Sequence, residues 1–359
     1  MTQDAAENKS SIGSSVKKAL AKAGITRLII FTFFIVLCIM ADAAGISVPS
    51  MLGFTVKRAG MYGVMALAML PAIQCGIGLN LGMTLGVLAG LVSTLLCIEY
   101  GLTGWPAFLF SAILGSVIAL PVGYLYGKLL NKLKGSEMTV STYVGFSIVS
   151  LLCVGWMLFP FKNNALTYAL GPGLRPTHNM NTSYGALLNN FMAFRIGKMT
   201  IPTGMVAFFL LCCFGMWLFS RSKTGTAMIA AGSNPRFAEA AGINVDQMRM
   251  IGTILSTVIA AVGIVVYQQG YGFLQLYQAP RQMGFIAASA ILIGGASVTK
   301  AKVSHVIIGV TLFQGLLTLG IQVANKYVPG GGMAEAFRII ISNGIILYAL
   351  ATSGGASRE

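Results

Sequence analysis

Apolar residues are gathered along this chain in repeated runs long enough for helices that span a bilayer, which need about 17–25 residues. A membrane barrel would instead show alternating segments of about ten residues, and the chain shows none. The pattern therefore predicts an all-α, polytopic membrane protein. We expect about ten spanning helices, at residues 26–45, 59–77, 80–99, 105–127, 139–159, 202–220, 250–269, 284–298, 304–323 and 336–352.

The runs predict one transmembrane domain over residues 26–352, between a polar tail at 1–25 and a short tail at 353–359. Two longer polar segments interrupt it, at about 161–200 and 221–249. The run at 284–298 is short, which leaves open a broken or re-entrant helix. The first run ends at Ala41–Gly45, a stretch like a cleavage site, but the polar leader before it is long for a signal peptide. We expect an uncleaved first helix.

Composition agrees with a membrane protein. The chain is 56% hydrophobic and 9% charged, whereas a soluble domain carries roughly 25% charged residues. Its net charge is +15, and most Lys and Arg fall in alternate connecting segments, beginning with the N-terminal tail. Basic residues mark the cytoplasmic side of membrane helices, so we expect both termini in the cytoplasm. No dense basic run with interleaved aromatics is present, which argues against nucleic-acid binding.

Catalytic and metal-binding patterns are missing from the sequence. The six cysteines lie inside apolar runs without metal spacing, and His178 and His305 fall on opposite predicted sides of the membrane. No phosphate-binding loop of the Gly-x-x-x-x-Gly-Lys-Ser/Thr type occurs, so we expect neither an enzyme nor a bound cofactor or metal. Asp42 and Glu99 lie near predicted helix ends. The lack of acids at membrane depth argues against an ion-coupled carrier, although a carrier or channel that acts alone remains the rival class.

Glycine recurs at every fourth position from Gly78 through Gly82 and Gly86 to Gly90. On a helix this spacing makes a groove that lets another helix approach closely, so we expect a packing face. Two amides lie beside it, Gln74 and Asn80. An amide at membrane depth needs a polar partner or water. Both readings stay open: the pair lines a polar passage, or it is satisfied by interhelical hydrogen bonds.

A glycine-broken segment from Val265 to Phe285 is rich in amides and phenols. Such groups suit hydrogen bonding to a neutral polyhydroxyl or heterocyclic solute, whereas an interfacial aromatic belt would explain the tyrosines but not the glutamines. With Gln74 and Asn80, the candidates for a translocation path in this segment are Tyr267, Gln268, Gln269, Tyr271 and Gln275.

The segment at 221–249 uses scarce charge and predicts a short helix. Asn234 is a good N-cap, Pro235 suits the first helical position, and Gly242 is a natural stop. A helix of two turns is marginal alone, so we expect it to dock against a partner. Its residues are Asn234, Pro235, Arg236, Glu239, Ala240, Ala241 and Gly242.

Three stretches, in order, resemble one known family. Gly232–Val245 (GSNPRFAEAAGINV) is similar to the cytoplasmic EAA-and-glycine loop of permease subunits in ABC importers of the ribose and branched-chain amino acid type. Gly76–Gly82 (GIGLNLG) resembles the Gly-Ile-Asp-Leu-Ser-Val-Gly signature of sugar permeases, and Ile286–Ser297 (IAASAILIGGAS) resembles their Ile-Ala-Ala-x-x-Leu-Gly-Gly-Thr-Ser segment. The likeness covers roughly residues 50–352.

The resemblance implies a permease of the bacterial inner membrane with about ten helices. It also implies two cytoplasmic ATPase subunits that bind ATP and Mg, a second permease subunit, identical or paralogous, and an external or lipid-anchored solute-binding protein. The helix around Asn234–Gly242 would then couple the ATPases to the membrane helices. The signature Asp and Ser are replaced by Gly78 and Asn80, which puts the solute in doubt. A monosaccharide is the first expectation, and a nucleoside, an autoinducer-like furanose or a riboflavin-like solute is the alternative.

Overall fold

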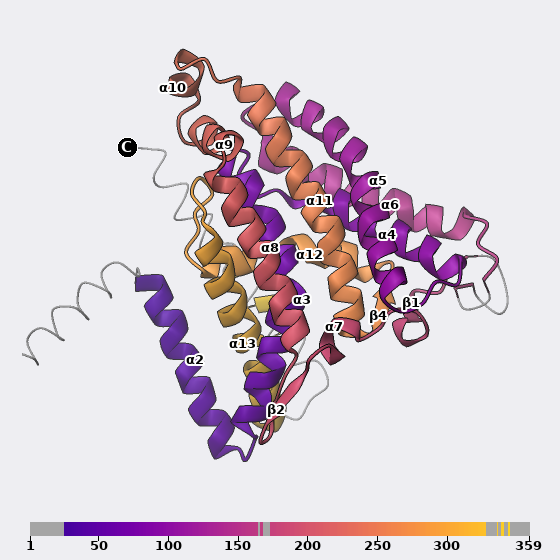
Figure 1. Cartoon of the computed structure of the whole chain (residues 1–359). Coiled ribbons are helices and arrows are strands. Elements are labelled where there is room, and N and C mark those ends of the chain that lie inside the picture. The colour runs from indigo at the N-terminus through magenta and orange to yellow at the C-terminus, as the bar shows by residue number, and fades with distance from the viewer. Residues whose placement is uncertain are drawn as a thin grey trace, which may run out of the picture.

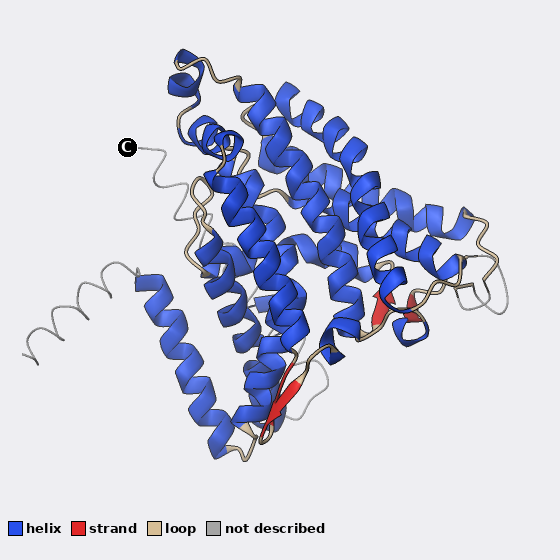
Figure 2. Ribbon diagram, viewed as in Figure 1, coloured by secondary structure: helices blue, strands red, loops and turns tan. Residues whose placement is uncertain are grey.

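The computed structural model describes residues 25–163, 166–167 and 173–327, together with residues 336, 339, 340 and 344. Within these residues the long helices run side by side between two ends of the molecule (Figure 1). One end carries the short helix α10 (Pro235–Ala240) and the other carries the short helix α7 (Leu187–Asn190). We call these the α10 end and the α7 end. The strands among the described residues lie toward the α7 end (Figure 2).

The long helices are α2 (Ile25–Ala43), α3 (Val48–Gln74), α4 (Thr84–Glu99), α5 (Gly104–Lys132), α6 (Glu137–Leu158), α8 (Thr203–Arg221), α11 (Val245–Tyr271), α12 (Gln278–Ile293) and α13 (Val303–Tyr327). The shorter helices are η1 (Leu81–Met83), η2 (Met180–Thr182) and α9 (Lys223–Ser233). Strand β1 (Thr177–Asn179) pairs antiparallel with β4 (Phe273–Gln275), and β2 (Phe194–Ile196) pairs antiparallel with β3 (Met199–Ile201).

Each of the first nine predicted runs contains a helix, while the tenth, 336–352, and the two tails lie almost wholly outside the described residues. Six of the described helices are long and apolar enough to cross a membrane. Helix α3 begins at Val48, earlier than the predicted start near 59. The apolar run misses its first turns because Lys57 and Arg58 lower the hydropathy there. Helix α12 has 16 residues, about 24 Å, which is less than the roughly 30 Å of a bilayer core. The short eighth run is thus a short helix.

The interior of the bundle is built on α3, α4 and α11. Helix α3 is buried at every position from Ala59 to Gln74. The outer helices instead expose large apolar side chains, among them Leu125 on α5, Leu158 on α6 and Leu211 on α8. Such a wide exposed apolar surface suits lipid and not water. The prediction of a mostly helical, multi-pass membrane protein is therefore confirmed.

The glycine series is only partly a helix face. Gly86 and Gly90 lie on α4 where a Cβ would overlap the backbone carbonyls of Thr257 and Ala261, so α4 and α11 approach closely there. Gly82 lies in η1 against the Tyr126 ring, and Gly78 lies before any helix, with φ of +87°. A single packing face over all four glycines is therefore wrong, because the α-helix starts only at Thr84.

The described part of the segment between α6 and α8 is hydrogen-bonded to α4. The Glu99 carboxylate accepts hydrogen bonds from the backbone amides of Lys162 and Asn163, at 3.0 and 3.1 Å. The hydroxyl of Tyr184 shares a hydrogen bond of 2.8 Å with that of Thr94, and burial raises the pKa of this tyrosine above its ordinary value. Glu99, which the sequence placed near a helix end, therefore has a structural role, because it holds the backbone that follows α6.

Candidate functional site

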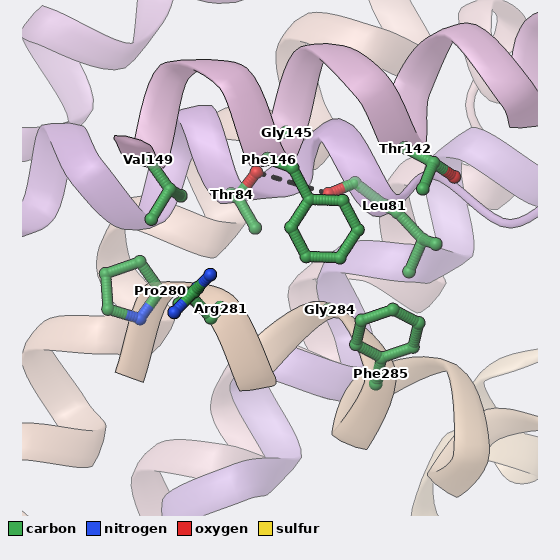
Figure 3. A pocket seen from close by; sticks show the side chains of 10 residues that line it. All are labelled: Leu81, Thr84, Thr142, Gly145, Phe146, Val149, Pro280, Arg281, Gly284 and Phe285. Atoms are coloured by element: carbon green, nitrogen blue, oxygen red, sulfur yellow. Dashed lines mark hydrogen bonds between the residues drawn. The ribbon is translucent and has the colours of Figure 1, made fainter. Parts of the chain in front are cut away.

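A groove runs along α6, between this helix, α12 and the turn from η1 into α4 (Figure 3). Thr142 and Phe146 line it from α6, and Arg281 and Phe285 line it from α12. Leu81 lies at the start of η1 and closes the third side. Three segments far apart in the sequence therefore build one surface.

The groove has a wide and a narrow section, which share Leu81, Thr142 and Phe285. The wide section has a volume of about 220 Å³ and reaches Met138, beside the first residue of α6. That residue, Glu137, is ion-paired with Arg249 near the start of α11, so the wide section faces the α10 end. The narrow section, about 10 Å³, continues toward the α7 end and has room for about one water molecule.

Two aromatic rings dominate the groove. The ring centroids of Phe146 and Phe285 are 5.9 Å apart, at an interplanar angle of 34°. The threonine hydroxyls beside them already donate to their own segments, Thr84 to the carbonyl of Leu81 at 3.2 Å and Thr142 to that of Met138 at 2.8 Å. Among these lining residues Arg281 is the cation. The surface is thus apolar and aromatic, with little free hydrogen-bonding capacity.

Asn80 lies next to the groove but points away from it. Its side chain is fully buried, and its Oδ1 accepts a hydrogen bond of 2.6 Å from the Tyr126 hydroxyl. Its Nδ2 donates to the Ser256 hydroxyl at 3.2 Å. In this conformation Asn80 joins η1 to α5 and α11, which is the interhelical alternative. Its neighbours Leu79 and Leu81 face the groove instead.

Gln74 is also used in contacts between helices. Its Nε2 donates to the Ala301 carbonyl at 3.4 Å, and its Oε1 accepts from the Ser220 hydroxyl at 3.3 Å. Neither described section of the groove includes it. Gln74 therefore connects the end of α3 to α8 and to the start of α13.

The other path candidates gather toward the α7 end, outside the groove. Tyr267 lies between Tyr62 and Tyr271, with centroid distances of 5.1 and 5.5 Å. Gln269 accepts a hydrogen bond of 3.1 Å from the Leu188 backbone amide, and Gln275 lies in β4. The side chain of Gln268 is fully buried, with no hydrogen-bond partner for its amide. Their part in a path stays a prediction.

The predicted helix at Asn234–Gly242 is present as α10. The Asn234 side chain accepts a hydrogen bond of 3.1 Å from the Phe237 amide, and Gly242 follows the helix with φ of +81°. The amides of Gly242 and Ile243 donate to the carbonyls of Glu239 and Ala238, which is the Schellman ending that favours glycine. Arg236, Glu239, Ala240 and Ala241 are exposed, whereas Ala238 is buried against the chain's own core and is not free to dock.

The sequence did not single out three residues that the fold makes prominent. Phe146 and Phe285 look like ordinary apolar helix positions until α6 and α12 are placed together. Phe237 projects from α10 with 67% of its surface exposed. The sequence did offer one signal for Phe237: it is the one large apolar residue within the predicted helix Asn234–Gly242.

The described residues contain no group of three or more His, Cys, Asp or Glu side chains placed to hold a metal ion. His178 lies in β1, and His305 lies near the start of α13. The cysteines of the described chain are all free.

Comparison with known proteins gives a consistent result. Residues 51–350 match the family described as the permease component of branched-chain amino acid transport systems. The chain is 22% identical to the nucleoside ABC transporter permease protein NupB of Lactococcus lactis, over 83% of this chain and 78% of that protein. It is 24% identical to NupC of the same organism, over 67% and 73%. It is 26% identical to the galactose/methyl galactoside import permease protein MglC of Salmonella typhimurium, over 55% and 56%. No solved structure matches significantly.

A family match over most of the chain decides against a carrier or channel that acts alone. In an ABC importer the permease is the transport component, and ATPase and solute-binding partners supply energy and solute. The chain is thus a member of the permease-component family of branched-chain amino acid transport systems, the multi-pass inner-membrane permease of an ABC importer.

Proposed function

We propose that the groove along α6 is this chain's share of a translocation path for a nucleoside, completed by a second permease subunit. The observation that carries the proposal is the pair of phenylalanine rings that pack against one another, 5.9 Å between centroids, and line the groove from α6 and α12. A planar base stacks well on aromatic rings, and that stacking is worth about 1–3 kcal/mol per base. Arg281 adds a cation that can stack on the same face or donate hydrogen bonds.

The groove suits a free monosaccharide less well. A sugar carries a hydroxyl on nearly every carbon, and each desolvated hydroxyl needs a partner. The donors of Thr84 and Thr142 are already committed to backbone carbonyls. The monosaccharide nevertheless remains the second candidate, because a relative named for galactose import is 26% identical. The sequence alone ranked these two in the opposite order, since the aromatic wall exists only in the fold.

The α10 end faces the cytoplasm in this proposal, with both termini on that side and about ten helices in the complete chain. Two ATPase subunits that bind ATP and Mg dock there, and the solute-binding protein docks at the α7 end. The exposed Phe237 is the apolar anchor in the ATPase surface, flanked by the charges of Arg236 and Glu239. Aromatic and arginine side chains are the usual anchors of interfaces. The basic connecting segments support this orientation.

Uptake of labelled adenosine by the whole transporter in its host tests the solute. Phe146→Leu and Phe285→Leu are expected to reduce uptake about tenfold, which is the size of a lost aromatic contact. Phe31→Leu is the control, because Phe31 is exposed on the outer helix α2. If the transporter takes up labelled galactose but no labelled adenosine, the nucleoside proposal is overturned in favour of a sugar.

Coupling through α10 is tested by Glu239→Lys. The residue is exposed, so the variant should insert and remain as stable as the parent chain. Uptake is expected to fall, while docking of the solute-binding protein at the α7 end is expected to be unchanged. Phe237→Ser is expected to lower recovery of the ATPase in a mild-detergent purification of the tagged chain. Normal uptake by Glu239→Lys would remove that side chain from coupling.

A further inference from the structure

A buried ion pair connects the segment that carries α10 to the helix that lines the groove. Arg249, near the start of α11, binds Glu137, the first residue of α6, through Nη2 and Oε1. The two side chains are only 10% and 13% exposed. The guanidinium Nε also donates to the Asn131 Oδ1 on α5, at 3.1 Å. One arginine thus joins three helices at the α10 end.

On the α11 side, buried packing and a helix cap hold the start of α11, which carries Arg249. Ala238 of α10 and Val245 of α11 lie together in one small buried cluster with Ala231 of α9. The start of α11 is fixed by Asn244, whose side chain accepts a hydrogen bond of 3.0 Å from the Gln247 amide. The buried cluster and the cap thus connect α10 to the first turns of α11, where Arg249 lies.

On the α6 side the same contact reaches the groove directly. Glu137 Oε2 accepts a hydrogen bond of 2.9 Å from the Gly135 amide, which fixes the turn before α6. The next residue, Met138, lines the wide section of the groove. Along the rest of α6 the buried positions are only Ser141, Gly145, Val149 and Trp156, a narrow stripe. Glu137 is the only charged residue of α6, so the pair with Arg249 is the only ionic contact of this helix.

A purely stabilising explanation is weak, because a buried ion pair often stabilises no more than apolar residues of the same volume. The chain has only nine acidic residues, and it places one of them in this contact. A second pair lies beside it: Lys134 and Asp246 join the same two segments but are 50% and 53% exposed. Exposed pairs contribute little, which makes Lys134–Asp246 a matched control.

We propose that the Arg249–Glu137 pair is a positioning contact that transmits movement of α10 to α6 and so sets the width of the groove. The inference rests on the proposed coupling role of α10, and it adds the route by which that coupling reaches the solute path. Arg249 and Glu137 touch neither solute nor ATP. They act by keeping α11 and α6 moving as one body during the transport cycle.

The experiment measures solute uptake and ATP hydrolysis together, in the whole transporter reconstituted with its ATPase and binding protein. Glu137→Gln is expected to assemble and to hydrolyse ATP, while the number of solutes moved per ATP falls roughly tenfold, within the usual range of coupling between sites. Lys134→Gln with Asp246→Asn should keep the parental ratio. A purely structural role would lower the amount of assembled transporter and leave the ratio unchanged.

Arg249→Lys is the second variant, for the case that Glu137→Gln does not accumulate. It keeps a cation near Glu137 but lacks the planar fork that also holds Asn131. Its ratio is expected to fall about threefold, at the low end for such coupling. A parental ratio in either assembled variant overturns the proposal. If Glu239→Lys also transports normally, the coupling role of α10 fails as well; if only that variant is impaired, α10 couples by another route.

Discussion

At the scale of single residues, one buried amide holds the irregular stretch that precedes η1 and α4. Asn80 is fully buried, and its two amide atoms are satisfied by Tyr126 and Ser256. A buried amide without partners is costly, so these contacts fix the position of the irregular stretch before η1. The amide side chain thus helps to hold Leu79 and Leu81 against the groove.

Tyr126→Phe tests this network. The change leaves the Asn80 Oδ1 buried without its donor, and we expect the free energy of unfolding to fall by about 1–3 kcal/mol. Thermal unfolding of the detergent-solubilised chain measures the loss. Tyr124→Phe serves as the control because Tyr124 is exposed on the same helix. Equal melting temperatures for the two variants would show that the hydrogen bond contributes nothing.

The sequence predicted that Asn80 needs a partner, because any amide at that depth does. It could not say which partner, since Tyr126 and Ser256 lie on helices whose mutual rotation is set by packing. The aromatic pair was beyond reach for the same reason. Phe146 and Phe285 are distant in the chain, and nothing local distinguishes them from phenylalanines that face lipid.

At the scale of elements, residues close together in the sequence predicted the ends of α10 correctly, but they did not predict where α4 begins. The cap at Asn234 and the stop at Gly242 depend on neighbours in the chain, and both appear as predicted. The glycine series from Gly78 to Gly90 has perfect spacing, yet it crosses from a turn through η1 into an α-helix. Spacing identifies a face only when the helix is continuous.

Gly86→Ala tests the close approach of α4 and α11. The added methyl group would overlap the Thr257 carbonyl, which belongs to helix backbone and cannot easily move. We expect a loss of about 1–3 kcal/mol from overpacking, or failure of the chain to accumulate. Gly215→Ala, on the outer helix α8, meets nothing within 4 Å and should be tolerated. Accumulation and unfolding temperature in membranes from matched cultures are the measurements.

At the scale of the whole molecule, hydropathy determined the class of fold and charge suggests its orientation. The exposed apolar surface of α5, α6 and α8 and the buried α3 and α4 follow from which helices lie at the centre, and that arrangement is not encoded in any one run. Helix α3 shows where hydropathy fails: Lys57 and Arg58 lie inside the helix, whereas the apolar run predicted a start near residue 59.

Orientation is tested by labelling single cysteines, placed in an otherwise cysteine-free chain, with a membrane-impermeant thiol reagent. Lys198→Cys, between β2 and β3, is expected to react in intact cells freed of their outer layers. Lys223→Cys, at the start of α9, should react only after permeabilisation, because basic segments remain in the cytoplasm. The reverse pattern would invert the topology and move α10 away from any ATPase.

The uneven width of the groove has a consequence for the energetics of the cell. If the groove is this chain's share of the solute path, its section of about 10 Å³ leaves room for about one water molecule on this chain's side, less than a hydrated ion needs. Stripping an ion of its hydration in an apolar section costs many kcal/mol. On that proposal the narrow section, with Arg281 in its wall, would oppose the passage of hydrated cations through an idle transporter and so limit leakage of the ion gradients that the cell maintains.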